Sequence, residues 1–244
     1  MHEKEIMEDK NILHTSKEIF YDLKPRICLF IGAPESGKTH MIRYLMYVLA
    51  KKKFFRFGKI FSQTAEFNDD YDYLPRHYLE EWKEEKAQAY VDKIKNVVKT
   101  QGNKKLGNNF LILDDLLGVM DPHTNFLKHL ASIHRHLKMT IFLTSQYLAN
   151  NVSTLLRSIC NHAFIFPGDD WNSHQLLWKA FGSSYYKFEE FQQVLKKARE
   201  VPHRCVFYTR KTKASAKKDG DKKENDTFMY YQAPHVPKFR IHMS

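Results

Sequence analysis

The chain has 244 residues, 43% of them hydrophobic, which is enough for one sizeable buried core. Its formal net charge of +11 favours a polyanionic partner such as nucleic acid, although charge alone does not decide this. Composition argues against three other classes: there is no run apolar enough to span a bilayer, no export signal in the mixed charges at the start, and no disulfide framework among three cysteines at unrelated spacings.

Apolar runs alternate with helical patterns along most of the chain. Residues 1–24 are polar and predict a leader or an added helix. Beyond them we expect strands near residues 27–31, 59–62, 110–113, 139–144 and 163–166, and helices over 41–49, 84–99 and 124–137. This alternation predicts an α/β fold, in which helices flank a mainly parallel central sheet.

The last forty residues have a different pattern. Two aromatic, β-prone runs, 204–209 and 227–231, predict a C-terminal β-hairpin extension within residues 204–244. Between them, residues 211–226 contain six lysines and four acidic residues and cannot form a core, which predicts a flexible loop. An arm that touches DNA is the alternative, but the acids offset most of the lysines, so a solvated hairpin loop is favoured.

A phosphate-binding loop is predicted between the first strand and the first helix. The sequence GAPESGKT matches the pattern G-x-x-x-x-G-K-[ST] and consists of Gly32, Ala33, Pro34, Glu35, Ser36, Gly37, Lys38 and Thr39. The two glycines allow successive N–H groups to surround a phosphate at the positive end of the helix. Lys38 is expected to reach the β- and γ-phosphates of ATP, and the Thr39 hydroxyl to bind Mg²⁺.

Two acidic residues follow the apolar strand in the sequence FLILDD. Asp114 lies 75 residues after Thr39, at the end of a strand expected beside the phosphate loop, and is the predicted second Mg²⁺ ligand. Asp115 is suited to polarise the attacking water. Alone, such a pair often only caps a helix, but after a phosphate loop the catalytic interpretation is favoured. The sequence therefore predicts a P-loop ATPase domain over residues 25–203.

A further polar residue, Gln146, follows the 139–144 strand in the sequence TSQ, and Arg135 precedes it by eleven residues. Together with GAPESGKT and FLILDD, this spacing resembles the FtsK/HerA superfamily of DNA-pumping ATPases. The short genome-packaging ATPases of large DNA viruses, polinton-like elements and virophages are the most similar group, and the length and small tail look most like the virophage type (Sputnik). The resemblance covers roughly residues 24–210.

This resemblance implies a motor that uses ATP and Mg²⁺ to translocate double-stranded DNA into a capsid. It implies a homo-oligomeric ring, a pentamer or hexamer, with DNA through its centre and a capsid vertex or portal component as partner. It also implies a location in the host cytoplasm or viral factory and an association with the virion. Gln146 would be the sensor of the γ-phosphate. Arg135 would be the arginine finger that acts on the neighbouring subunit's nucleotide, with Arg157 as the second choice.

Other interpretations stay open at this point. Arg135 could simply complement a helix C-terminus, and Asp115 is shorter than the glutamate that many members of the superfamily carry, so its role as base is less certain. The sequence KKKFFRFGK, residues 51–59, is either a basic and aromatic DNA-binding patch or helix-ending lysines followed by core aromatics.

The function as a whole has alternatives too. A small P-loop kinase and a nucleotide-dependent adaptor that does not hydrolyse ATP also carry such a phosphate loop. A GTPase is disfavoured because the sequence has no guanine-reading N-K-x-D motif. Four histidines between 123 and 136 are poorly spaced for zinc.

Overall fold

The computed structural model describes residues 24–65, 67, 69–116, 125–146, 160–210 and 227–241. The predicted leader, Arg157 and the 211–226 loop therefore lie outside the described residues, apart from Lys24 at the end of the leader.

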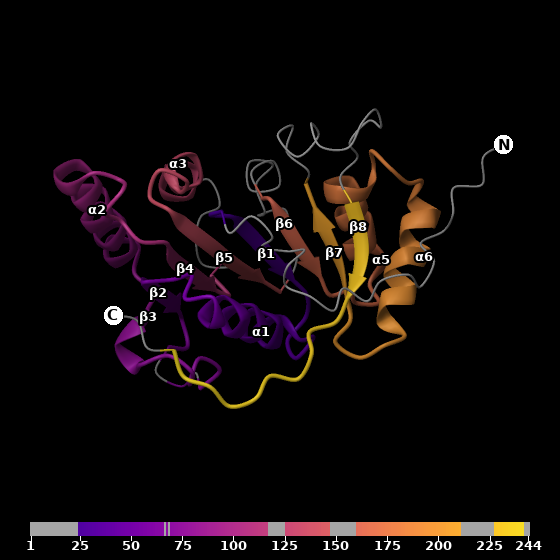
Figure 1. Cartoon of the computed structure of the whole chain (residues 1–244). Helices are drawn as coiled ribbons and strands as arrows, with labels where there is room; N and C mark the ends of the chain where they lie inside the picture. Colours follow the sequence, from indigo (N-terminus) through magenta and orange to yellow (C-terminus); the bar gives the residue numbers. More distant parts are fainter. Residues whose placement is uncertain are drawn as a thin grey trace.

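One eight-stranded sheet forms the centre of the molecule, with the order β3-β2-β4-β5-β1-β6-β7-β8 (Figure 1). Its strands are β1 (Ile27–Ile31), β2 (Phe57–Ser62), β3 (Leu79–Glu81), β4 (Asn109–Asp114), β5 (Met139–Ser145), β6 (His162–Ile165), β7 (Cys205–Thr209) and β8 (Thr227–Tyr231). The strands β1 to β6 pair with one another in parallel. The hairpin β7-β8 continues this sheet, because β7 pairs antiparallel with β6.

Helices cover both faces of the sheet. In the described part of the chain they are α1 (Lys38–Lys51), α2 (Glu84–Gln101), α3 (Asn125–Ile133), α5 (Trp171–Leu177) and α6 (Phe188–Arg199), with the short 3₁₀ helix η1 (Arg76–Tyr78) and the π-helical segment η2 (Trp178–Gly182). In Figure 1, α1 lies on the face opposite α2 and α3. Alternate residues of β1 belong to the hydrophobic cores on the two faces of the sheet. Ile27 and Leu29 pack in the core under α2, α3 and α6, whereas Cys28 and Phe30 pack in the core under α1.

The predicted mainly parallel α/β architecture is confirmed, with strand bounds within one or two residues of the expected ones. The prediction of a helix over 124–137 is partly wrong, because α3 ends at Ile133 and residues 134–138 form a turn. Lys138, in the left-handed region at φ 47°, leads this turn into β5. Two elements between residues 168 and 203, α5 and α6, and the short strand β3 were not expected.

The chain after β8 returns across the molecule beneath α1 (Figure 1). Its end is fixed to the loop that follows β2, because the Ile241 amide donates a hydrogen bond to the Tyr73 carbonyl at 2.8 Å. Among the described residues, no helix combines the length and apolar character needed to cross a membrane.

Candidate functional site

The predicted phosphate loop joins β1 to α1 and curls around the start of that helix. Gly37 stands at the N-cap of α1 with φ 108°, a left-handed conformation that glycine adopts without steric cost. The Gly32 amide donates to the Ser145 carbonyl at 3.1 Å, which ties the start of the loop to the end of β5. The loop therefore lies at the carboxyl edge of the parallel strands, where ligands bind in open α/β sheets.

Close packing explains why Gly32 has no side chain. A Cβ atom there would come within 2.6 Å of the Phe166 Cβ and 2.7 Å of the Ser36 hydroxyl. Among the described residues, that hydroxyl is buried and has no hydrogen-bond partner. A buried polar atom of this kind in a phosphate loop fits a ligand that accepts hydrogen bonds. Phe166, just after β6, was not expected to pack here.

Lys38 folds back over the loop. Its Nζ donates to the Gly32 carbonyl at 2.5 Å and to the Ala33 carbonyl at 2.8 Å. Burial lowers the pKa of this ammonium, and the nearby carboxylates of Asp115 and Asp114 oppose that shift. The structure thus brings the predicted lysine and both predicted acids into one electrostatic site.

Asp114 ends β4 and is only 9% exposed. The Thr144 hydroxyl, on the neighbouring strand β5, donates to its Oδ1 at 2.9 Å. Burial raises the pKa of Asp114 above its ordinary value, although hydrogen bonds from Thr144 and Tyr71 counteract the rise. A buried carboxylate in this position fits a cation that would compensate for its lost hydration.

Asp115, the next residue, is exposed, whereas Asp114 is buried. Its φ of 55° lies in the left-handed region, which is uncommon for residues other than glycine and is often found at functional sites. Its amide donates to the Thr144 hydroxyl at 2.6 Å, and its exposed carboxylate accepts a hydrogen bond from the Gln146 side-chain amide. The predicted base and the predicted sensor are therefore in direct contact.

The loop after β2 supplies one side of this site. Tyr71 is buried beside Asp114, and its pKa is raised by burial first and by the Asp114 charge second. Its ring centroid lies 6.1 Å from that of Tyr73, which stacks on Phe239 of the C-terminal segment at 4.9 Å. The sequence around these tyrosines carries no motif that would indicate their contact with the acid.

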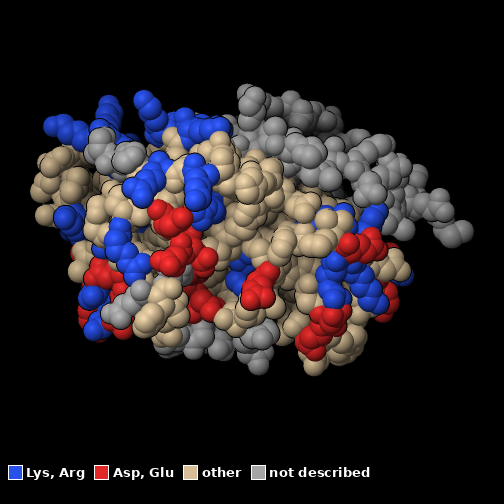
Figure 2. All heavy atoms as spheres, turned by 90° about the horizontal axis from the view of Figure 1, so that it is seen from below, with Lys and Arg blue, Asp and Glu red and all other residues tan. Residues whose placement is uncertain are grey.

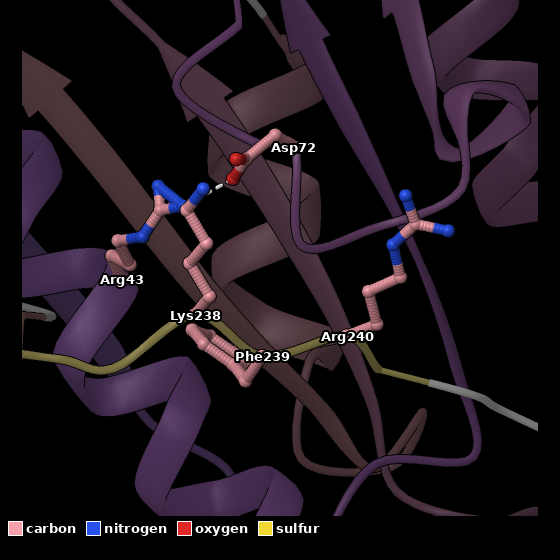
Figure 3. Close-up of a pocket in the computed structure, with 5 residues that line it drawn as sticks. All are labelled: Arg43, Asp72, Lys238, Phe239 and Arg240. Atoms are coloured by element: carbon pink, nitrogen blue, oxygen red, sulfur yellow. Dashed lines mark hydrogen bonds and ion pairs between the residues drawn. The ribbon is translucent and has the colours of Figure 1, made fainter.

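A pocket opens next to this stack, lined by Arg43, Asp72, Lys238, Phe239 and Arg240. Figure 3 shows Arg43 of α1 in its ion pair with Asp72, while the Arg240 side chain extends away from that pair. The Arg43 guanidinium also lies 5.2 Å above the Tyr73 ring. The C-terminal segment, α1 and the loop after β2 thus form one connected structure beside Asp114.

Arg135 is not part of this cluster. It lies in the exposed turn before β5, at the amino edge of the sheet, whereas Asp114 and Gln146 lie at the carboxyl edge. A strand of seven residues such as β5 spans about 23 Å. Arg135 is consequently too far to reach the phosphate loop of its own chain.

Thr39 and Asp114 are the side chains that would hold Mg²⁺. A hydroxyl and a buried carboxylate are oxygen ligands of the kind that Mg²⁺ prefers, and the ion commonly binds through one or two carboxylates together with phosphate oxygens. When bound, Mg²⁺ neutralises charge on the β- and γ-phosphates.

Comparison with known proteins places this site in a family. A family model described as "Poxvirus A32 protein" matches residues 17–180, which is more than half of the chain. The chain belongs to the poxvirus A32 protein family. Within the A32 family match lie the phosphate loop, both acids, Arg135 and Gln146. An uncharacterised protein of Invertebrate iridescent virus 6, 075L, is 24% identical over 190 residues, which are 75% of this chain and 70% of that protein.

Solved structures of P-loop ATPases share the fold of this A32-family chain. The genome packaging NTPase B204 from Sulfolobus turreted icosahedral virus 2, in complex with AMPPCP, matches 86% of this chain and 98% of B204, with a TM-score of 0.56 and 13% identity. The match to the cytoplasmic domain of the Thermomonospora curvata type VII secretion ATPase EccC covers 86% of this chain and 25% of the EccC chain, with a TM-score of 0.56 and 14% identity. The predicted P-loop fold is confirmed.

Proposed function

We propose that this chain is a genome-packaging ATPase, a motor that hydrolyses ATP with Mg²⁺ to move double-stranded DNA into a viral capsid. The observation that carries the proposal is the convergence of Lys38, Asp114 and Asp115 at the carboxyl edge of the sheet. Membership of the A32 family supports it, and so does a fold shared with a viral packaging NTPase. The likeness to the virophage type stays a prediction.

Each residue of the site has a role in this proposal. The amides of the loop 32–39 and the Lys38 ammonium bind the phosphates, and Thr39 and Asp114 hold Mg²⁺. Asp115 accepts a proton from the attacking water, and Gln146, hydrogen-bonded to Asp115, responds to the γ-phosphate. No acceptor other than water is required, which separates this function from that of a kinase.

The position of Arg135 supports assembly into a ring. Because its own phosphate loop is out of reach across the sheet, Arg135 serves as a finger only if it approaches the nucleotide of a neighbouring subunit. A ring of five or six copies around DNA provides such an interface for every nucleotide. We propose that this ring docks on a capsid vertex or portal component in the host cytoplasm or viral factory and associates with the virion.

Steady-state phosphate release tests the proposal. We expect hydrolysis that requires Mg²⁺, needs no added acceptor and accelerates with duplex DNA. Phosphate release that no DNA stimulates would rule out the motor function. Transfer of phosphate only to an added small molecule would identify a kinase. Nucleotide binding without release would identify an adaptor.

A further inference from the structure

Three loops meet at the amino edge of the sheet, on the opposite side from the nucleotide site. They precede β2, β4 and β5, which are adjacent strands, and they comprise residues 51–56, 102–108 and 134–138. The Arg56 amide donates to the Asn108 carbonyl at 2.9 Å, and the Asn103 side chain donates to the His136 carbonyl at 2.9 Å. Hydrogen bonds therefore join the three loops into one surface.

The charged side chains of this surface are all positive. The three loops contain no aspartate or glutamate. Besides Arg135 they carry seven cationic residues, here called the basic edge: Lys51, Lys52, Lys53, Arg56, Lys104, Lys105 and Lys138. All of these except Lys138, which is half-buried, are exposed, and within the described residues none of the seven forms an ion pair. Figure 2 shows lysine and arginine side chains gathered along one margin of the lower face, apart from the acidic ones.

Two members of the basic edge have a strained backbone. Lys53 and Lys138 have φ values of 49° and 47°, in the left-handed region where glycine or asparagine is the usual choice. Such a conformation is unfavourable for a residue with a Cβ, which approaches the following carbonyl oxygen. Lys138 has a structural contact as well, because its Nζ donates a hydrogen bond to the Leu106 carbonyl at 2.9 Å. Lys53 is exposed, and glycine would relieve its strain, so a need for positive charge explains the lysine at that position.

The aromatic residues of this segment indicate which polyanion the surface fits. Phe54 and Phe55 are 6% and 8% exposed, and their rings pack against each other in the core. Of the described residues, the large hydrophobic side chains that are exposed are Phe67 and Trp171, and both lie outside the three loops. The basic edge therefore offers no platform for stacking unpaired bases. Flexible lysines without such a platform fit the phosphates of a duplex.

We propose that the basic edge is a binding surface for the phosphate backbone of double-stranded DNA, separate from the nucleotide site. This inference rests on the proposed function, which requires DNA. It adds the location of the DNA-binding surface on the chain. The length of β4, six residues or about 20 Å, separates this surface from Asp114 of the same chain, so DNA held here leaves that chain's own nucleotide site open. Since phosphates carry no sequence information, binding at this surface is insensitive to sequence.

The test compares two triple variants of the full chain that lose the same charge. Lys53→Gly, Lys104→Gln and Lys105→Gln together remove three members of the basic edge, and the glycine also relieves strain. In the control, Lys83→Gln, Lys86→Gln and Lys95→Gln remove three lysines that each lie within 4 Å of an acid, namely Glu81, Glu80 and Asp92. Arg135 is left unchanged in both variants because it belongs to the proposed catalytic machinery.

Binding of a fluorescent 30-base-pair duplex is measured by anisotropy at several salt concentrations, together with ATP hydrolysis without DNA. We expect the basic-edge variant to lose affinity about tenfold or more, and its log–log salt slope to fall by about 0.9 for each contact removed, up to about 2.7. Its hydrolysis without DNA stays at the wild-type level, and its unfolding temperature is not lowered. The control variant keeps a nearly wild-type slope.

The outcomes separate this inference from the proposed function. If wild-type protein binds the duplex and both variants bind equally well, the inference is wrong and the motor function stands. An acidic protein partner would then be the ligand that this charge fits. If wild-type protein neither binds the duplex nor responds to it, the motor function itself fails. A basic-edge variant that loses affinity only for single strands would also overturn the inference.

Discussion

Gln146 and Asp115, which follow two adjacent strands of the sheet, are joined by a hydrogen bond from the glutamine side-chain amide to the aspartate carboxylate. The Thr144 hydroxyl extends this contact, because it accepts from the Asp115 amide and donates to the Asp114 carboxylate. The proposed sensor, base and metal ligand are thus linked by hydrogen bonds. A change at the γ-phosphate that moves Gln146 would therefore also move the carboxylate that activates water.

Asp115→Asn tests the role of the proposed base. Asparagine keeps the size of the side chain but accepts no proton, so we expect hydrolysis to fall by about 10² to 10⁴ while ATP affinity changes little. Phosphate release and binding of a fluorescent ATP analogue are the two measurements. Gln146→Ala provides a comparison, since it removes the partner of Asp115 and leaves the carboxylate. Near-normal hydrolysis by Asp115→Asn would show that another group activates the water.

Lys38→Ala removes the ammonium that the loop carbonyls hold beside Asp114 and Asp115. We expect hydrolysis to be lost, because that charge stabilises the phosphoryl group as it is transferred. Lys24→Ala, a change of the same charge at the amino edge of the sheet, serves as the control. If Lys38→Ala retained activity close to that of the wild type, ATP would not be hydrolysed at this site.

The sequence predicted the parts of the site whose geometry is local. Gly32, Gly37 and Lys38 act within one loop, and Asp114 is placed by the end of a single strand. Thr144 and Tyr71 could not be assigned, because they meet Asp114 only through the order of the strands and the path of a distant loop. The helix end was missed for a related reason. Leu137 continues the apolar spacing of α3 and is buried, yet it reaches the core from a turn.

Asp114→Asn should stabilise the protein in the absence of ligand. The pKa of Asp114 is raised in the folded state by burial, whereas in the unfolded chain the carboxyl loses its proton near pH 3.9. Stability therefore falls as pH rises from about 3.9 through the folded pKa, and the loss persists at neutral pH. Asparagine carries no charge there, so thermal unfolding at pH 7 should occur at a higher temperature.

Mg²⁺ and ATP should reverse the order of the two unfolding temperatures, because only the carboxylate of the wild type compensates the charge of the ion. With both ligands present, we expect the wild type to gain more thermal stability than Asp114→Asn, and hydrolysis by the variant to depend strongly on Mg²⁺ concentration. The Asp115→Asn variant, which replaces an exposed carboxylate, should unfold like the wild type without ligand. Equal metal dependence of wild type and Asp114→Asn would assign the magnesium ligand elsewhere.

Phe239→Ala tests the link between the C-terminal segment and the site. The centroid of the Phe239 ring lies 4.9 Å from that of Tyr73 and 5.1 Å from that of Tyr47. Loss of this ring should therefore destabilise the fold by about 1 to 3 kcal/mol. We also expect slower hydrolysis, since Tyr73 packs near Tyr71, which contacts Asp114. Lys238→Ala, an adjacent exposed change, is the control. Lower stability with unchanged hydrolysis would limit the segment to a structural role.

Arg135→Ala tests whether the finger acts between subunits. A positive charge provided by a neighbour raises phosphoryl transfer by about 10³ to 10⁵ in well-studied systems, so we expect ATP binding to survive and hydrolysis to be nearly lost. Because Arg135 and Asp114 occupy opposite edges of the sheet, the loss cannot come from the variant's own phosphate loop. Arg56→Ala, another exposed cation of the same edge, should retain hydrolysis without DNA.

Mixing distinguishes action within a subunit from action between subunits. Arg135→Ala subunits keep an intact phosphate loop, and Lys38→Ala subunits keep an intact finger. Where the first meets the second in a ring, one complete site forms, so a mixture of the two inactive variants should recover part of the activity, and the recovery should vary with their ratio. Co-purification of one variant through an affinity tag carried only by the other confirms that mixed oligomers form. If they form and remain inactive at every ratio, Arg135 is not the finger, and Arg157 is the next residue to exchange.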